Sequence, residues 1–244
     1  MSWEPPAPYT SVEPDDVVSF VVGLVLAHDS TPVVVGVGGS VAVGKSTFAG
    51  ELAARLAPRS VAVVSTDGFL LSNADLAARG LSARKGFPES YDVGLARTVL
   101  AGIARRDPTV AVRGYSHRTY DLDDTSRPLG RPDVVIVEGV NALAPPFRES
   151  LSVGIYLDAD EDDIRTWYVS RFASLVEEAR HDPGSFFATW AATPAGQVAE
   201  IALFAWEHIN VVNLVEHIEP TRWQADVVVR KGPDHRVTHV AVRA

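Results

Sequence analysis

The sequence contains no cysteine among its 244 residues. This absence excludes disulfide bonds and thiolate metal sites, and it fits a protein of the reducing cytoplasm. Basic residues are also scarce: 22 lysines and arginines stand against 31 aspartates and glutamates, which gives a formal net charge of -9 at pH 7. Because nucleic-acid-binding domains are normally basic, we expect no nucleic-acid partner.

The longest uninterrupted apolar run, VVSFVVGLVLA at 17–27, is too short to cross a membrane. A membrane-spanning helix needs about 20 apolar residues. The residues before this run are acidic and rich in proline, unlike those of a signal peptide. We therefore interpret 17–27 as a helix packed on the core, and we expect a cytoplasmic location and no membrane partner.

Apolar segments alternate with helical segments along most of the chain. Four prolines fall within residues 1–14, which we expect to form a mobile tail. Strands are predicted at 33–37, 61–65, 109–112, 134–137, 153–157, 225–229 and 237–242. Helices are predicted at 45–57, 74–79, 92–106, 160–180 and 196–217, with the last interrupted or ended near Asn213. This alternation favours a mostly parallel sheet with helices on both faces, in a single domain over 15–244.

A glycine-rich segment, GVGGSVAVGKST at 36–47, begins within the first of these buried strands and runs into a helix. Residues 39–46 match the pattern G-x-x-x-x-G-K-[ST] at every fixed position. In such a loop the backbone amides face phosphate, the lysine meets the outer phosphates and the serine hydroxyl binds Mg²⁺. An ordinary glycine-rich turn would not need the lysine. The segment predicts an α/β fold of the P-loop NTPase type that binds ATP and Mg²⁺ through Gly39, Ser40, Val41, Ala42, Val43, Gly44, Lys45 and Ser46.

Two carboxylates follow buried strands, Asp67 in STDGF and Glu138 in VVIVEG. Ligands of open α/β sheets bind at the carboxyl ends of the strands. There Asp67 can act as general base toward an acceptor hydroxyl, or orient it for attack on the γ-phosphate. Glu138 can hold Mg²⁺ through water or bind substrate. A capping role for Asp67 and a solvated strand end for Glu138 are the structural alternatives. The chain lacks an N-K-x-D signature after a later strand, which disfavours a GTPase.

Five motifs in the order GGSVAVGKST, TDGF, KGFPESYD, YSHRTYD and VEGVN resemble those of the bacterial type I pantothenate kinases. That family belongs to the wider phosphoribulokinase/uridine kinase group. The similarity continues through IYLDADEDDIRTWYVSRF, HINVVNL, EPTRWQADVV and DHRV, and it covers about residues 33–240. It implies ATP-dependent phosphorylation of the terminal hydroxyl of pantothenate, the first step toward coenzyme A. Two alternatives stay open: a kinase of another small alcohol, such as a nucleoside, sugar or pantothenate analogue, and a nucleotide-binding regulatory protein without turnover.

The resemblance also implies roles for individual residues at matching positions. Lys45 and Asp67 would be catalytic, and Thr47 would join Lys45 and Ser46 at the nucleotide phosphates and Mg²⁺. The acceptor site would be lined by Tyr115, His117, Tyr168 and Asn213. The nucleotide would be contacted by Arg171 and His235. Tyr168 and Arg171 are three residues apart, so they can share one face of a helix and point into one cleft. A homodimer is compatible with the resemblance.

The chain departs from the family pattern at two positions. Gly50 stands one turn into the helix after the phosphate loop, where the pantothenate kinases usually place an arginine. In the family that arginine helps to hold coenzyme A, an inhibitor that competes with ATP. Leu175 stands where the family tends to have an aromatic residue near the acceptor. We therefore expect weak inhibition by coenzyme A and a less selective acceptor pocket.

Overall fold

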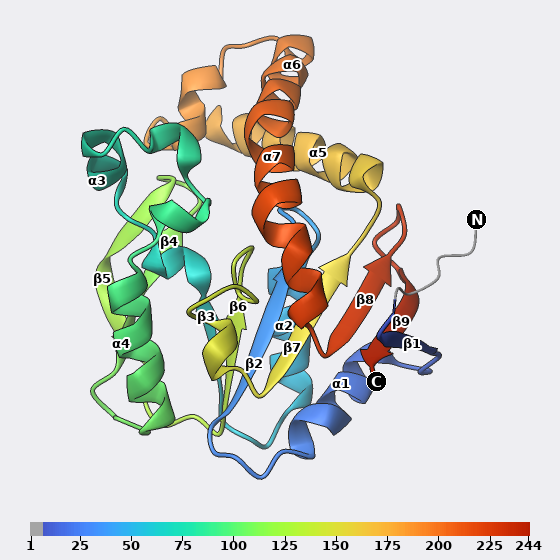
Figure 1. Ribbon diagram of the computed structural model, residues 1–244. Coiled ribbons are helices and arrows are strands. Elements are labelled where there is room, and N and C mark those ends of the chain that lie inside the picture. Colours follow the sequence, from blue (N-terminus) through green and yellow to red (C-terminus); the bar gives the residue numbers. More distant parts are fainter. Residues whose placement is uncertain (1–6) are drawn as a thin grey trace.

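The computed structural model describes residues 7–244 and has a central seven-stranded sheet flanked by helices (Figure 1). The strand order is β1-β9-β8-β7-β2-β6-β3. The strands are β1 (Tyr9–Val12), β2 (Val33–Gly39), β3 (Val61–Ser65), β6 (Val134–Glu138), β7 (Val153–Asp158), β8 (Val227–Lys231) and β9 (Val237–Arg243). Strands β3, β6, β2, β7 and β8 run parallel, and β9 and β1 add an antiparallel edge. The predicted mostly parallel α/β sheet is confirmed.

Alternating residues of the central strands belong to two different apolar clusters. Val33 and Val35 join α1 (Val17–Leu26) and α2 (Lys45–Arg55) in one cluster, whereas Val34 joins α4 (Val93–Ala104) in the other. Successive side chains of a strand point to opposite faces of a sheet, so the continuous apolar runs reflect burial on both faces. The helices are α1 (Val17–Leu26), α2 (Lys45–Arg55), α3 (Asn73–Ala78), α4 (Val93–Ala104), α5 (Glu161–Ala179), α6 (Ala195–Ala205) and α7 (Val211–Asn213).

The last helical segment is longer and less regular than predicted. It runs from α6 through a π turn at Trp206–Asn210, α7, a second π turn at Leu214–Ile218 and a 3₁₀ turn at Glu219–Gln224. The helical segment therefore does not end near Asn213, but its hydrogen-bonding pattern changes on both sides of that residue. By length and hydropathy Ala195–Gln224 could cross a membrane. The burial of Trp206, Leu214 and Ile218 in the main apolar cluster accounts for part of that apolar composition.

The prediction of a mobile tail over 1–14 is wrong for residues 9–12, which form β1. This strand pairs with β9, and the buried Tyr9 donates its hydroxyl to the carbonyl of Ala225 at 2.8 Å. The prolines around this segment concealed the strand, because an edge strand tolerates neighbouring prolines that a central strand would not. The prediction for residues 1–6 lies outside the described residues.

A separate two-stranded antiparallel sheet consists of β4 (Ala111–Ser116) and β5 (Asp121–Pro128). The prediction of a strand at 109–112 captures only the beginning of β4. Strand β5 has the sequence DLDDTSRP, and most of it is exposed. It therefore lacks the apolar alternation by which a half-buried strand is recognised.

Candidate active site

The phosphate loop connects the end of β2 to the beginning of α2. Ala42 and Gly44 have positive φ angles of 64° and 90°, and Gly44 is the residue before the helix. No side chain of the described residues caps α2. The first backbone amides of this helix are therefore available to an anion, and the helix dipole adds to their attraction. The conformation fits a nucleotide phosphate at residues 39–46.

Lys45, the first residue of α2, is buried and directs its ammonium group back across the loop. Its Nζ donates a hydrogen bond to the carbonyl of Ser40 at 2.7 Å. Burial lowers the pKa of Lys45 to about 8, while the carboxylates of Glu138 and Asp67 act in the opposite direction. Lys45 thus lies within electrostatic reach of both predicted carboxylates.

The two carboxylates lie at the same edge of the sheet because β3 and β6 are adjacent and parallel. In this pairing Ser65 is opposite Glu138, and Asp67 follows two residues later in a 3₁₀ turn at Thr66–Phe69. Burial raises the pKa of Asp67, and the neighbouring charge of Glu138 raises it further, whereas Lys45 lowers it. Asp67 does not cap this turn, since Ser65 does, and Glu138 is only 8% exposed. Neither structural alternative therefore describes these residues.

Ser46 and Glu138 bring two oxygen atoms together beside the phosphate loop. The Ser46 hydroxyl donates to Glu138 Oε2 at 3.2 Å. Mg²⁺ prefers oxygen ligands, and in kinase sites it takes one or two protein ligands together with phosphate oxygens and water. Residues 7–244 contain no group of three or more His, Cys, Asp or Glu that could hold a metal without such help. The pair Ser46 and Glu138 fits a magnesium ion shared with a nucleotide.

Strand β4 and helix α5 bring a second group of predicted residues to the same place. Arg171 of α5 approaches His117, the residue directly after β4, with 3.4 Å between Nη2 and Nε2. Burial lowers the pKa of His117, and the Arg171 charge adds to that effect. The ring of Tyr115 packs edge-on against His117 at 5.3 Å. Arg171 also acts on the pKa of Lys45 and of Asp67, so this group of residues borders the carboxylates.

The similarities to known proteins now identify the family. The model of the phosphoribulokinase/uridine kinase family matches residues 34–172. A pantothenate kinase of Chelativorans sp. (strain BNC1) is 45% identical over 229 residues, which are 87% of this chain and 72% of that relative. A pantothenate kinase of Sorangium cellulosum (strain So ce56) is also 45% identical, over 87% of this chain and 73% of that protein. The chain belongs to the pantothenate kinase family.

A solved structure agrees with the fold of this family member. The putative fructose transport system kinase from Silicibacter sp. TM1040 superposes with a TM-score of 0.66 at 22% identity, over 84% of this chain and 95% of the other. At this identity the likeness establishes the fold alone. The predicted P-loop kinase fold is confirmed.

The remaining predicted residues of this pantothenate kinase family member come from three parts of the fold: α5, the helical segment 195–224 and the turn between β8 and β9. Tyr168, one turn before Arg171, packs against Trp206 at 5.8 Å. Asn213 donates from Nδ2 to the carbonyl of Gly86 at 3.0 Å. His235 stacks on the indole of Trp167, with ring centroids 3.9 Å apart. The nucleotide and acceptor roles of these residues stay predictions.

Two lysines at the site were missed in the sequence. Lys231, the last residue of β8, donates to the carbonyl of Val43 in the phosphate loop at 3.0 Å. Lys85 donates to the carbonyl of Tyr120 at 2.6 Å, and burial lowers its pKa to about 8, opposed by the charges of Asp121 and Asp67. A lone lysine has no spacing signal. The only hint was that Lys85 belongs to the motif KGFPESYD.

An aromatic cluster joins Tyr120 to the segment Phe186–Trp190. Tyr120 stacks on Phe186 at 4.6 Å, and Phe187 and Trp190 pack beside them. Leu175, where the family tends to have an aromatic ring, packs against the buried part of this cluster. Leu175 therefore borders the apolar cluster that contains Phe187.

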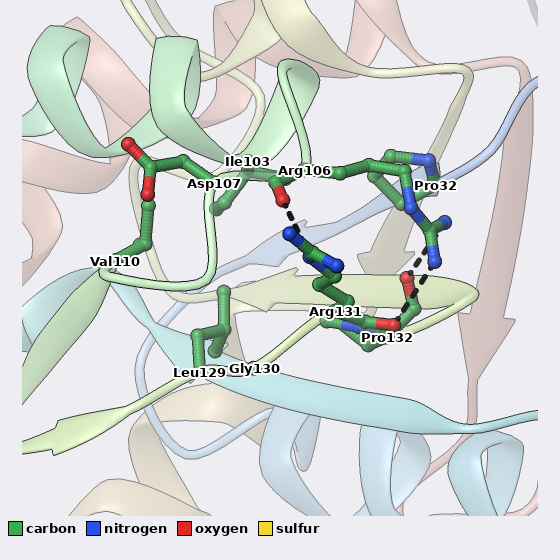
Figure 2. A pocket seen from close by; sticks show the side chains of 9 residues that line it. All are labelled: Pro32, Ile103, Arg106, Asp107, Val110, Leu129, Gly130, Arg131 and Pro132. Atoms are coloured by element: carbon green, nitrogen blue, oxygen red, sulfur yellow. Dashed lines mark hydrogen bonds between the residues drawn. The ribbon is translucent and has the colours of Figure 1, made fainter.

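A small cavity lies away from this site, next to the residues that precede β2 and β6 (Figure 2). Its volume is about 10 Å³, which suffices for one water molecule at most. Pro32 and Pro132 line it at the amino ends of those two strands, together with Arg106 and Arg131. The cavity therefore lies at the opposite end of these strands from the phosphate loop and the two carboxylates.

Proposed function

We propose that this protein transfers the γ-phosphate of ATP to the terminal hydroxyl of pantothenate. One observation carries the proposal: the half-buried Asp67 lies within electrostatic reach of Lys45 of a complete phosphate loop, in a chain 45% identical to a pantothenate kinase. A carboxylate next to a phosphate loop is the arrangement that phosphoryl transfer to an alcohol requires.

The protein's own residues supply positioning and charge. The amides of residues 39–46 and the ammonium of Lys45 hold the nucleotide phosphates, and Thr47 lies exposed beside them. Ser46 and Glu138 would hold Mg²⁺, which would neutralise phosphate charge. Asp67 takes the proton of the acceptor hydroxyl as the new O–P bond forms and the bond between the γ-phosphorus and the ADP oxygen breaks.

The acceptor enters between β4, α5 and the helical segment 195–224. We assign it to Tyr115, His117, Tyr168 and Asn213, which come from these three parts of the fold. Arg171 lies next to His117 and within electrostatic reach of Asp67, so its charge favours the ionised carboxylate. Arg171 and His235 meet the nucleotide. The protein acts in the cytoplasm on a small molecule, without nucleic acid or membrane, and a homodimer is compatible with this function.

Phosphorylation of a related alcohol is the second candidate. Leu175 packs against the aromatic cluster where the family tends to have a ring, which alters the surface of the acceptor pocket. A regulatory protein without turnover is disfavoured, because Lys45, Asp67 and Glu138 are together in the site.

The product distinguishes these candidates. The protein is incubated with ATP, Mg²⁺ and pantothenate, and the product is analysed by phosphorus and proton NMR. A phosphomonoester on the terminal hydroxyl supports the proposal. No phosphorylated pantothenate, with ADP formed in the presence of another alcohol, contradicts it.

A further inference from the structure

Gly86 has both of its backbone polar groups held by side chains. Its φ angle is +89°, a conformation that favours glycine. The amide donates to Ser90 Oγ at 3.0 Å. The carbonyl accepts two hydrogen bonds, from Asn141 Nδ2 at 3.3 Å and from Asn213 Nδ2 at 3.0 Å. A carbonyl oxygen has two lone pairs, so this acceptor is fully used.

The two asparagines come from different parts of the fold. Asn141 lies three residues after Glu138, beyond the end of β6, and Asn213 lies in the helical segment 195–224. Both are buried, with 4% and 7% of their surface exposed. Gly86 therefore joins the metal side of the site to the acceptor side.

The orientation of both amides follows from this shared acceptor. Since both Nδ2 atoms face the Gly86 carbonyl, both Oδ1 atoms face away from it. The Asn213 oxygen is buried and accepts no hydrogen bond from any residue of 7–244. The Asn141 side chain and the hydroxyls of Thr66 and Tyr91 are also buried, and they lie together, with Thr66 and Asn141 as hydrogen-bonding neighbours of Tyr91. Buried polar atoms are normally paired, and exceptions concentrate at functional sites.

The group of Asn141, Thr66 and Tyr91 borders the catalytic carboxylate. Thr66 is the neighbour of Asp67 in the chain. Burial raises the pKa of Tyr91 well above its usual range and the charge of Asp67 adds to this, whereas hydrogen bonding with Thr66 and Asn141 lowers it. Asn141 thus contacts the Gly86 turn with one end of its amide and faces the surroundings of Asp67 with the other.

We propose that Asn141 is a positioning residue for phosphoryl transfer, which holds the Gly86 turn, and with it Lys85 and Asn213, in register with Asp67. Lys85 precedes Gly86 in the chain and reaches the Tyr120 carbonyl and Asn73 Oδ1, each at 2.6 Å. A shift of the Gly86 turn would therefore also shift Lys85, whose charge lowers the pKa of Asp67. A misplacement of about 1 Å can cost about 10²-fold in rate. This inference rests on the proposed function, because that function assigns Asn213 to the acceptor.

The test is the kinetics of Asn141→Ala, measured with the alcohol that the unaltered protein phosphorylates best. We expect kcat/KM for the acceptor to fall about ten- to a hundred-fold, while the affinity for ATP, measured by calorimetry, changes less than about two-fold. The matched control is Thr221→Val, which also removes a buried hydrogen bond, from Oγ1 to the carbonyl of Ile218 at 2.6 Å, but away from Gly86. It should leave both constants unchanged.

A double-mutant cycle separates positioning from a general loss of packing. Asn141→Ala and Asn213→Ala act on one carbonyl, so their combined effect on acceptor kcat/KM should be clearly smaller than the product of the single effects. Equal losses for acceptor and ATP, or independent effects in the cycle, would overturn the proposal. Asn141→Ser is the second variant, because its hydroxyl is too short to reach Gly86. If neither variant folds, Asn141 serves folding and the proposal is wrong. A failure of the pantothenate assignment would instead appear in the unaltered protein.

Discussion

Replacement of Asp67 by asparagine should affect catalysis and folding in opposite directions. Asparagine has nearly the same shape but cannot take a proton. A positioned general base contributes about 10²–10⁴-fold to rate, which corresponds to about 3–5 kcal/mol of transition-state free energy. We therefore expect kcat of Asp67→Asn to fall by that factor.

The expected effect on stability follows from the direction of the pKa shift. Burial, and then the charge of Glu138, raise the pKa of Asp67 above its value in the unfolded chain. A carboxyl group whose pKa is raised on folding binds protons more tightly in the folded state, so its ionised form lowers stability at neutral pH. The neutral asparagine should leave the melting temperature unchanged or raise it.

The assay measures kcat by coupled ADP release at saturating substrates and the melting temperature by scanning calorimetry. Asp124→Asn, at an exposed carboxylate of β5, is the matched control and should change neither quantity. Turnover at the normal rate would remove Asp67 from the chemical step. A clear fall in melting temperature would refute the argument from burial.

Further predictions concern the nucleotide, the pH profile and the acceptor. Lys45→Met removes the ammonium group at the phosphate loop, so it should weaken ATP binding. Because burial lowers the pKa of Lys45 to about 8, its charge does not stabilise the fold, and the melting temperature should not fall. An unchanged ATP affinity in calorimetry would exclude the phosphate role. Lys45 loses its charge as the pH rises through about 8, so kcat/KM for ATP should decline there, and a flat profile above this pH would contradict the assignment. Gly50 is exposed, with open space beside it, and provides no charge for the phosphates of coenzyme A. Arg55 and Arg84 are already paired with Asp16 and Glu89. Coenzyme A should therefore inhibit weakly at subsaturating ATP. Gly50→Arg should raise the affinity for coenzyme A about ten- to a hundred-fold, because a hydrogen bond to a charged group contributes about 1.5–3 kcal/mol. Tight inhibition of the unaltered protein would refute this. If Leu175 relaxes selectivity, chain-extended pantothenamides should approach pantothenate in kcat/KM, whereas a strong preference for pantothenate alone would argue against it.

The parts of the site that the sequence predicted are those fixed by local rules. A phosphate loop is one continuous segment whose glycines, lysine and serine stand at set distances, so residues 39–46 could be recognised without the fold. Asp67 and Glu138 follow buried strands, and parallel strands bring their carboxyl ends to one edge. The positions of the central strands could also be predicted, since burial on both faces of the sheet leaves continuous apolar runs in the sequence.

The parts that escaped prediction depend on approaches between distant segments. Gly86 meets Asn141 and Asn213 across separations of 55 and 127 residues, which no local pattern records. Lys231 reaches the phosphate loop from 188 residues beyond Val43. Strand β1 was mistaken for a tail because its pairing with β9 joins the two ends of the chain.

The most direct test of the central claim is a coupled ADP-release assay that compares pantothenate with nucleosides and sugars at equal concentrations, with ATP and Mg²⁺ present throughout. The account predicts that pantothenate has the highest kcat/KM of the panel and that Asp67→Asn abolishes most of this signal. No turnover of pantothenate by the folded, ATP-binding protein would contradict it, as would a nucleoside or sugar with a higher kcat/KM.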